Sequence, residues 1–539
     1  MGCSRTIAPL VVLVGASLVA VPALAAGAQG AGGQQGEQKQ QTEAERHGDD
    51  ASRITDEHIP LLVEGALTRP RPILELGAPF LGSGPLRPGF TMPGGAVWQP
   101  SFMLFGNYRS AISVTDNGEL TTTQWANRLD LFGNLYLTGT ERFVIGIRPM
   151  DRTVNGVQRF SGYTGLSPDP LDAGGWSNEL NFNWDTVTHL FFEGDFQELF
   201  PNLDIEDRHP LDFGFSVGRQ PINFQEGLLI NDFIDAVGIT RNNLKPGGTA
   251  NLRITGLWAW NGINRNTPTT PFVTRNLEAE HSWLVGVFTE TDFRATTMAI
   301  DALFVRGGTF VSSGSPQPTA ADSPAEIAVP ATDGIYVGVS FVQRIKAINT
   351  AFRVVGSAPV GEETAADNPL EIGNAAATGA VIFSEISWTP HHGQNLFYLN
   401  GFWALDEYRA AALDPLVPGP LARTGILFSG VGLGNYAAAL SPTADEAVGA
   451  VFGHQIFFAH GRRQLLLEGG GKYSTSSCAG DERGCAAQSV AAGARYQIAA
   501  GRRGVFVFDG YVAYDQLRGV RPQDSLLRLG SRVELLIKF

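Results

Sequence analysis

The sequence predicts an all-β fold: a transmembrane antiparallel β-barrel of about 18 strands, with short turns at one rim and long loops at the other. Three observations predict it. In the last thirteen residues, Leu527 to Phe539, apolar side chains alternate with mostly charged ones at period two, as in a strand with one wet face. Short and long connections alternate along the chain. Charged residues make up only 17% of it, against about 25% in ordinary soluble domains, and its 65 glycines suit a curved sheet.

The N-terminus predicts export. Arg5 supplies a positive charge, Ile7 to Val21 form an apolar run, and Ala23-Leu24-Ala25 is a cleavage site of small residues. We therefore expect residues 1–25 to be a signal peptide. An uncleaved anchor helix is the alternative, and the shortness of the apolar run disfavours it.

Residues 26–95 carry no clear strand pattern. They begin with a stretch rich in Gly, Gln and Glu and end in one rich in Pro and Gly. We expect them to form a disordered periplasmic lead-in, which lines the base of the barrel or tethers it. Residues 96–539 then form the outer-membrane barrel, since no run of about 18 apolar residues predicts a transmembrane helix there.

Tryptophans gather near the ends of the predicted strands, which favours aromatic girdles at two membrane interfaces over the core of a soluble all-β protein. These residues are Trp125, Trp184, Trp258, Trp260, Trp283, Trp388 and Trp403. Long polar loops are expected at about 312–333, 359–376, 408–446, 475–486 and 516–525.

Alternation also predicts which charged side chains face the lumen. They are Arg128, Asp130, Arg142, Arg148, Arg528, Arg532 and Glu534. Two interpretations stay open. Opposite charges can pair across the wall, because an unpaired charge in a crowded lumen is costly. Alternatively, they form a ladder or ring that orients an ionic solute.

The final strand, which ends at Phe539, resembles the closing strand of bacterial outer-membrane barrels. That resemblance implies recognition of the terminal aromatic residue by the barrel-assembly machinery. It also implies a location in the outer membrane of a Gram-negative bacterium, in contact with lipid and lipopolysaccharide.

One segment, Phe213 to Arg241, departs from plain alternation. Proline is disfavoured inside a central strand, so the wall should end or bend at Gly218-Arg219-Gln220-Pro221. Charged residues then mix with apolar ones, and the candidates for a pore constriction are Arg219, Asp232, Asp235 and Arg241.

The same segment resembles the alginate-export family and related OprD-like porins. Its matching positions are Gly218, Arg219, Gln220, Gly227, Asp235 and Val237. The resemblance covers about 30 residues. It implies an 18-stranded barrel that passes small or polymeric solutes, charged or carbohydrate, through a charged lumen. The net charge of −14 departs from the positive lumen of alginate exporters.

Cys478 and Cys485 flank a polar, turn-rich string, so an exported chain can join them in a disulfide at a loop tip. No nucleophile elbow, haem motif or metal-ligand spacing stands out, and His391-His392 lie in a predicted turn. We therefore expect no enzyme activity, cofactor, metal or nucleic-acid partner. Passive diffusion of a small molecule or polysaccharide through the barrel is the expected function; an adhesin, receptor or structural sheath is the alternative.

Overall fold

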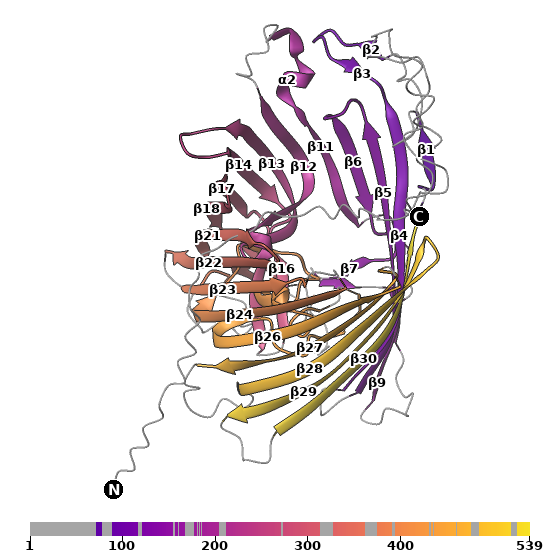
Figure 1. The fold of residues 1–539 in the computed structure, drawn as a ribbon, viewed down its shortest axis with the longest axis vertical. Coiled ribbons are helices and arrows are strands. Elements are labelled where there is room, and N and C mark those ends of the chain that lie inside the picture. Colours follow the sequence, from indigo (N-terminus) through magenta and orange to yellow (C-terminus); the bar gives the residue numbers. More distant parts are fainter. Residues whose placement is uncertain are drawn as a thin grey trace, which may run out of the picture.

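The computed structural model describes residues 70–539 except 71, 78–88, 117–120, 155–156, 160, 168–176, 180–181, 183, 185, 204–211, 271–272, 313–326, 362–374, 391–393, 431–432, 435, 460, 476–484 and 519–524. Eighteen antiparallel strands close into a barrel, which confirms the predicted fold and strand number (Figure 1). The predicted signal peptide, residues 1–25, and Cys478 lie outside the described residues, so the peptide and the disulfide remain predictions.

The wall strands follow one another in chain order. They are β4 (Ser101–Asp116), β5 (Thr121–Tyr136), β6 (Arg142–Ile147), β11 (Val187–Asp195), β12 (Phe213–Phe224), β13 (Ile230–Leu244), β14 (Asn251–Asn261), β17 (Trp283–Asp292), β18 (Thr296–Arg306), β21 (Asp333–Ile345), β22 (Ile348–Val360), β23 (Gly379–Trp388), β24 (Asn395–Tyr408), β26 (Ala444–Phe458), β27 (Arg463–Ser474), β28 (Cys485–Ala500), β29 (Gly504–Arg518) and β30 (Ser525–Lys538).

Shorter elements lie before and between them. They are β1 (Leu74–Leu76), β2 (Phe90–Thr91), β3 (Val97–Trp98), β7 (Arg152–Val154), β8 (Val157–Arg159), β9 (Ser161–Ser167), β10 (Ser177–Glu179), α2 (Phe196–Leu199), η1 (Pro201–Leu203), η2 (Gln225–Gly227), β15 (Asn264–Thr270), β16 (Val273–Glu278), β19 (Thr309–Ser312), β20 (Ile327–Pro330), β25 (Ala412–Leu413) and η3 (Pro420–Thr424).

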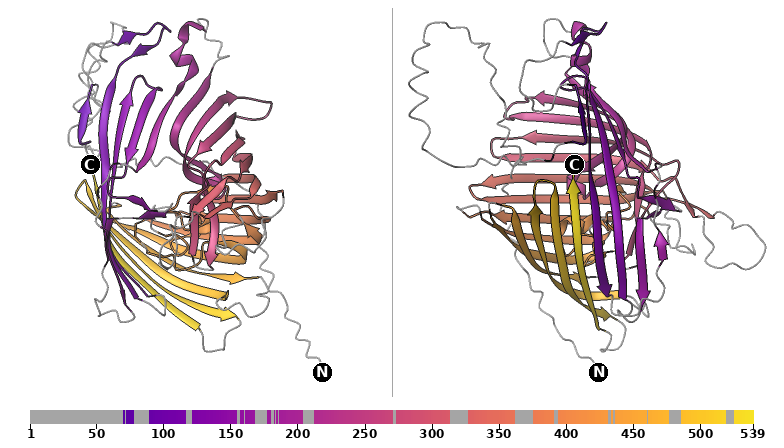
Figure 2. Two further views of the ribbon diagram at one scale, coloured as in Figure 1. Left: turned by 180° about the vertical axis from the view of Figure 1, so that it is seen from behind. Right: turned by 90° about the vertical axis from the view of Figure 1, so that its right-hand side faces the viewer.

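The last strand closes the barrel against the first. β30 pairs with β4 from Leu529 opposite Asp116 to Lys538 opposite Asn107, and Figure 2 shows the two strands side by side. Phe539 extends the seam, because its N–H donates to the carbonyl of Gly106 over 3.0 Å and its carbonyl accepts from the Gly106 N–H over 2.8 Å. The C-terminal residue is therefore part of the closure.

Part of the lead-in joins this seam. β1 pairs with β4 at residues 102–104, nearer the start of β4 than Asn107, where its pairing with β30 ends. The β2–β3 hairpin lies beside α2 at the same rim, where the N–H of Asn202 donates to the carbonyl of Gly94 over 3.4 Å (Figure 1). We call this the turn rim, because the short turns and Phe539 lie there, and the opposite one the loop rim.

The outer face of the wall is apolar. On β30, Leu527 is 53% exposed and Val533 45%, whereas Arg532 and Glu534 on the inner face are 4% and 3% exposed. Alternation thus sorts apolar residues outward, as in barrels whose outer face contacts lipid. No helix among the described residues is long and apolar enough to cross a membrane.

One hairpin leaves the wall. β11 pairs with β12 as far as Arg219, and β14 pairs with β13 as far as Asp235. Beyond these points β12 and β13 pair with each other up to Phe224 opposite Ile230, and Ile230 pairs in parallel with Ala412 of β25. We call residues 220–234 the folded hairpin.

Gly218 allows the folded hairpin to turn away from the barrel wall. Its φ is +121°, and a Cβ there would lie 2.2 Å from the carbonyl oxygen of Leu190. Glycine is the residue that adopts this conformation without strain and permits such a close approach. The predicted bend is therefore present, with both strands continuing beyond it.

The folded hairpin packs against the inner side of the wall. Ile230 and Ile234 are completely buried in one apolar cluster with Leu257, Leu284 and Leu303 of β14, β17 and β18. This burial of apolar surface holds the hairpin inside the barrel.

A long loop, residues 409–443, also fills part of the interior. Leu421, Leu427, Phe428 and Leu440 are at most 1% exposed and pack in a cluster with inward residues such as Phe383. We call it the plug loop. The sequence-based expectation of a polar loop at about 408–446 was wrong, because most side chains of this segment are apolar and bury themselves in the lumen.

Candidate functional site

The charged residues predicted to face the lumen are held in ion pairs. Arg148 Nε lies 2.9 Å from Asp130 Oδ1, and Arg128 Nη2 lies 3.0 Å from Asp151 Oδ2. Arg142 pairs with Glu193 across to β11. Burial raises the pKa of the Asp151 carboxyl above its ordinary value, while the Arg128 guanidinium acts in the opposite direction.

A second group of pairs lies on the closing strands. Glu534 bridges two arginines, with Oε1 2.6 Å from Arg109 Nε and Oε2 2.6 Å from Arg532 Nη1. Arg532 also pairs with Asp509, and Arg528 pairs with Asp515. Of the two interpretations of these charges, the ionic contacts support pairing across the wall.

The plug loop covers the inner ends of these pairs. Arg528 Nη2 donates to the carbonyl of Ala439 over 2.6 Å, and the Arg532 guanidinium lies 5.4 Å from the ring centre of Tyr436. Arg528 and Arg532 are at most 9% exposed. This arginine-rich part of the wall therefore contacts the plug loop instead of free solvent.

β27 anchors the plug loop. Glu468 accepts hydrogen bonds from the backbone N–H groups of Ile426, at 3.0 Å, and Leu427, at 2.9 Å, and from the Tyr398 hydroxyl. Four residues nearer the loop rim, on the same face of β27, the Lys472 ammonium donates to the carbonyl of Thr443 over 2.6 Å. A charge-assisted hydrogen bond is stronger than a neutral one, so these contacts fix the loop in place.

An open cavity of about 1020 Å³ extends from the turn rim to the tip of the folded hairpin. Its lining residues come mainly from the strands β11 to β14, β17, β18, β21 and β22. Five carboxylates and two guanidinium groups line it: Glu193, Asp195, Glu226, Glu290, Asp301, Arg253 and Arg353. We call this cavity the vestibule.

The hairpin tip forms the inner end of the vestibule. Gln225 Nε2 donates to Asp301 Oδ2 over 2.7 Å, and the Phe224 ring stacks on Phe288 with centres 3.4 Å apart. Glu226 Oε2 lies 2.7 Å from Arg423 Nη1 of the plug loop, and its Oε1 lies 3.7 Å from Arg353. The hairpin, the plug loop and the wall thus meet at one point.

The backbone at this tip is unusual. Gln225 and Glu226 have φ of 51° and 56°, and Gly227 has φ of 87°. Non-glycine residues rarely adopt positive φ, so contacts with the wall must hold this turn in shape.

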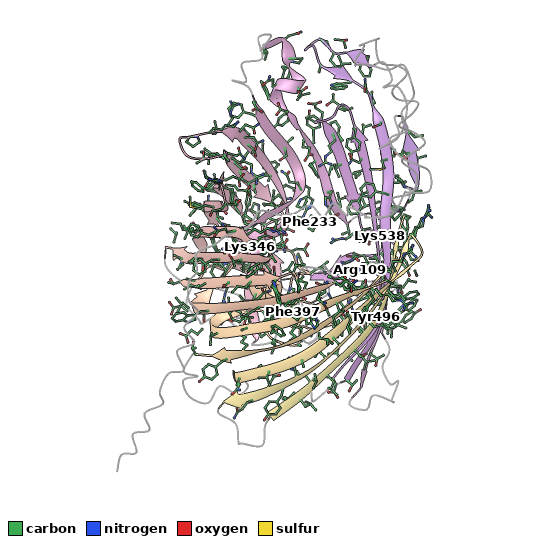
Figure 3. The ribbon with its side chains drawn as sticks, in the orientation of Figure 1. Arg109, Phe233, Lys346, Phe397, Tyr496 and Lys538 are labelled. Atoms are coloured by element: carbon green, nitrogen blue, oxygen red, sulfur yellow. The ribbon has the colours of Figure 1, made fainter. Side chains whose placement is uncertain are left out.

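Two of the predicted constriction residues lie together on the folded hairpin's base. Arg219 and Asp235 are opposite each other in register, with Nη1 and Oδ1 3.7 Å apart, and Asn261 Nδ2 donates to Asp235 over 2.7 Å. They share a face with Phe233, whose ring centre lies 5.0 Å from that of His189 and 5.4 Å from Arg148 Cζ. Figure 3 shows Phe233 and Arg109 beside the open centre of the barrel.

The other two predicted constriction residues point elsewhere. Asp232 is 2% exposed and accepts from the backbone N–H of Asn264 over 2.8 Å, on the hairpin face that packs against the wall. Arg241 lies near the turn rim, opposite Phe213 in register and on the same outer face. Its Cζ is 4.8 Å from the centre of the Phe213 ring, and its guanidinium donates to the carbonyl of Asp212. Neither lines the lumen, which corrects the expectation for both.

Sequence reasoning missed the groups that line the vestibule. Glu226 stands inside the segment that was singled out, and its neighbour Gly227 marks a turn, but no sequence signal brings it to Arg353 or Arg423. Asp301 faces inward from β18, and the preceding residue, Ile300, is exposed on the outer face. Among the described residues, no group of three or more His, Cys, Asp or Glu could hold a metal ion.

No protein-family model and no curated protein matches the chain. Solved structures similar to it include OccAB2 from Acinetobacter baumannii, with 9% identity, TM-score 0.46 and coverage of 81% of this chain and 98% of that one. A BenF-like porin from Pseudomonas fluorescens Pf-5 matches with 8% identity, TM-score 0.46 and coverage of 81% and 99%. OccK2 (OpdF) from Pseudomonas aeruginosa in complex with glucuronate matches with 8% identity, TM-score 0.44 and coverage of 81% and 98%.

Proposed function

We propose that the protein is an outer-membrane channel through which small polar solutes diffuse passively. The observation that carries the proposal is the combination of an apolar outer face with a charged cavity of about 1020 Å³ inside one closed barrel. A closed barrel satisfies all its backbone hydrogen bonds and can therefore span lipid. A polar interior gives hydrated solutes a path that the bilayer denies them.

In this proposal the turn rim faces the periplasm, and solute enters or leaves the vestibule through that rim. The fixed plug loop restricts passage to the side of the barrel that carries the folded hairpin. We place the constriction between the hairpin and the neighbouring wall, with Glu226, Arg219 and Asp235 as its candidate charged groups.

Single-channel recording of the full-length mature protein in planar bilayers tests the proposal. Steady openings above the lipid background are expected. A barrel that inserts and stays sealed would contradict a channel and favour the alternative role, in which the loops bind a partner or form a sheath. Arg219→Ala and Asp235→Asn should each alter conductance or ion selectivity, and an unchanged channel would remove those residues from the constriction.

A further inference from the structure

We infer that the vestibule makes this channel selective for cations, and that its solutes are small molecules with net positive charge. The inference rests on the proposed channel function and adds the charge of what passes. It follows from a difference in net charge between the arginine-rich side of the lumen, which the plug loop covers, and the side that forms the vestibule.

The arginine-rich side is neutralised and covered. Arg528 and Arg532 pair with Asp515 and Asp509, and the plug loop lies over both arginines. A solute in the vestibule therefore has no free guanidinium of this group beside it. Arg528 and Arg532 therefore contribute no unpaired positive charge to the vestibule.

The vestibule side keeps an excess of carboxylates. With the ion-pair partners Arg142, Arg423 and Glu385 included, six carboxylates face four guanidinium groups. Asp195 and Asp301 have no cationic partner among the described residues. Asp301 accepts from Gln225 and from the backbone N–H of Thr289, and Asp195 caps α2 through the N–H of Gln197.

The exposed carboxylates extend through the depth of the vestibule. Side chains of Glu193 and Glu290 are 33% and 42% exposed near the turn rim, and that of Glu226 is 52% exposed at the hairpin tip. Each of these three lies beside an arginine, so the excess negative charge is that of Asp195 and Asp301. A narrow polar space with walls of low dielectric focuses the field of this excess, so it concentrates cations and repels anions.

The inner end of the vestibule already holds a cation. The Arg423 guanidinium of the plug loop lies 2.7 Å from Glu226 and 3.1 Å from Glu385 and is 34% exposed. Carboxylates from the hairpin and from the wall thus converge on Arg423, and the wall residue Arg353 contacts the same two carboxylates, so this end accommodates positive groups.

The test is the reversal potential of the full-length channel under a KCl gradient. The wild-type channel should favour K⁺ over Cl⁻. The double variant Asp195→Asn, Asp301→Asn should reduce the permeability ratio roughly twofold or more. At Asp195 asparagine keeps the oxygen that caps α2, but at Asp301 it keeps only one of the two acceptor oxygens, so heat-modifiable electrophoresis of the double variant must first show a folded barrel.

Glu280→Gln is the matched control, because this exposed carboxylate lies in a loop away from the vestibule, and its loss should leave the ratio unchanged. A wild-type channel that favours Cl⁻, or a double variant with unchanged selectivity, would overturn the inference while leaving the channel function intact. Absence of any conductance would instead contradict the channel itself.

Discussion

Gln225, at the tip of the folded hairpin, donates a 2.7 Å hydrogen bond to the Asp301 carboxylate on wall strand β18. Both residues are buried, so the contact joins the tip to the wall away from bulk solvent. The hairpin leaves the wall at Gly218 and returns to it here, which makes it a fixed partition within the lumen.

Gln225→Ala should destabilise the barrel by about 1–3 kcal/mol, because Asp301 loses a hydrogen-bond donor in a buried site. Urea unfolding of protein in lipid vesicles measures this change. Asn261→Ala removes a donor to Asp235 at an exposed position, and should cost less than about 1 kcal/mol. Equal losses in the two variants would argue against a buried anchor at the tip.

Gly218→Ala should lower stability by about 1–3 kcal/mol, because alanine is strained at this φ and its Cβ would collide with the Leu190 carbonyl. The midpoint of heat-induced mobility change on electrophoresis reports the loss. Gly256→Ala is the matched control, since a Cβ at that strand position meets nothing within 4 Å. If both variants melt together, the bend does not depend on the conformation of Gly218.

Glu468→Ala should release the plug loop. The substitution leaves the N–H groups of Ile426 and Leu427 without their acceptor, at about 1–3 kcal/mol each. We expect faster proteolysis within residues 425–443 and a larger, noisier conductance. Tyr398→Phe removes one donor to the same carboxylate and should have a smaller effect on both measurements. A protected loop in Glu468→Ala would show that apolar packing alone holds it.

Arg532→Met should destabilise the barrel by about 3–5 kcal/mol, because it leaves Asp509 and Glu534 buried with fewer positive partners. Arg253→Gln, which breaks an exposed pair with Glu290, should cost about 0–1 kcal/mol. Urea midpoints of the two variants give the comparison. A small loss for Arg532→Met would mean that the seam does not rely on its ion pairs.

Period-two alternation predicts much of this fold. Leu527, Val533 and the residues between them fix which face of β30 is apolar, and the same rule places Arg532 inside. Alternation works because a strand has a lipid-facing and a lumen-facing side wherever it lies in the wall, which β12 and β13 leave beyond Arg219 and Asp235.

The site could be predicted less well, because alternation describes the wall and not what folds into it. Asp232 and Asp235 stand three residues apart, so a regular strand must place them on opposite faces, and that spacing could have excluded one of them. The sequence of the plug loop also indicates burial, since Leu427 and Phe428 are apolar residues in a connection that we expect to be polar. No sequence pattern indicates that Glu226 meets Arg423, because that contact depends on two loops entering one lumen.

Chemical modification of a cysteine at Asn223 tests the central claim most directly, because this exposed residue lines the vestibule at the tip of the folded hairpin. A positively charged thiol reagent added to the Asn223→Cys channel should reduce single-channel conductance in a discrete step. Val285→Cys, on the outer face of β17, and the wild-type protein should keep their conductance under the same treatment. If mass spectrometry shows complete modification of Asn223→Cys while its conductance stays unchanged, the folded hairpin does not border the conducting path.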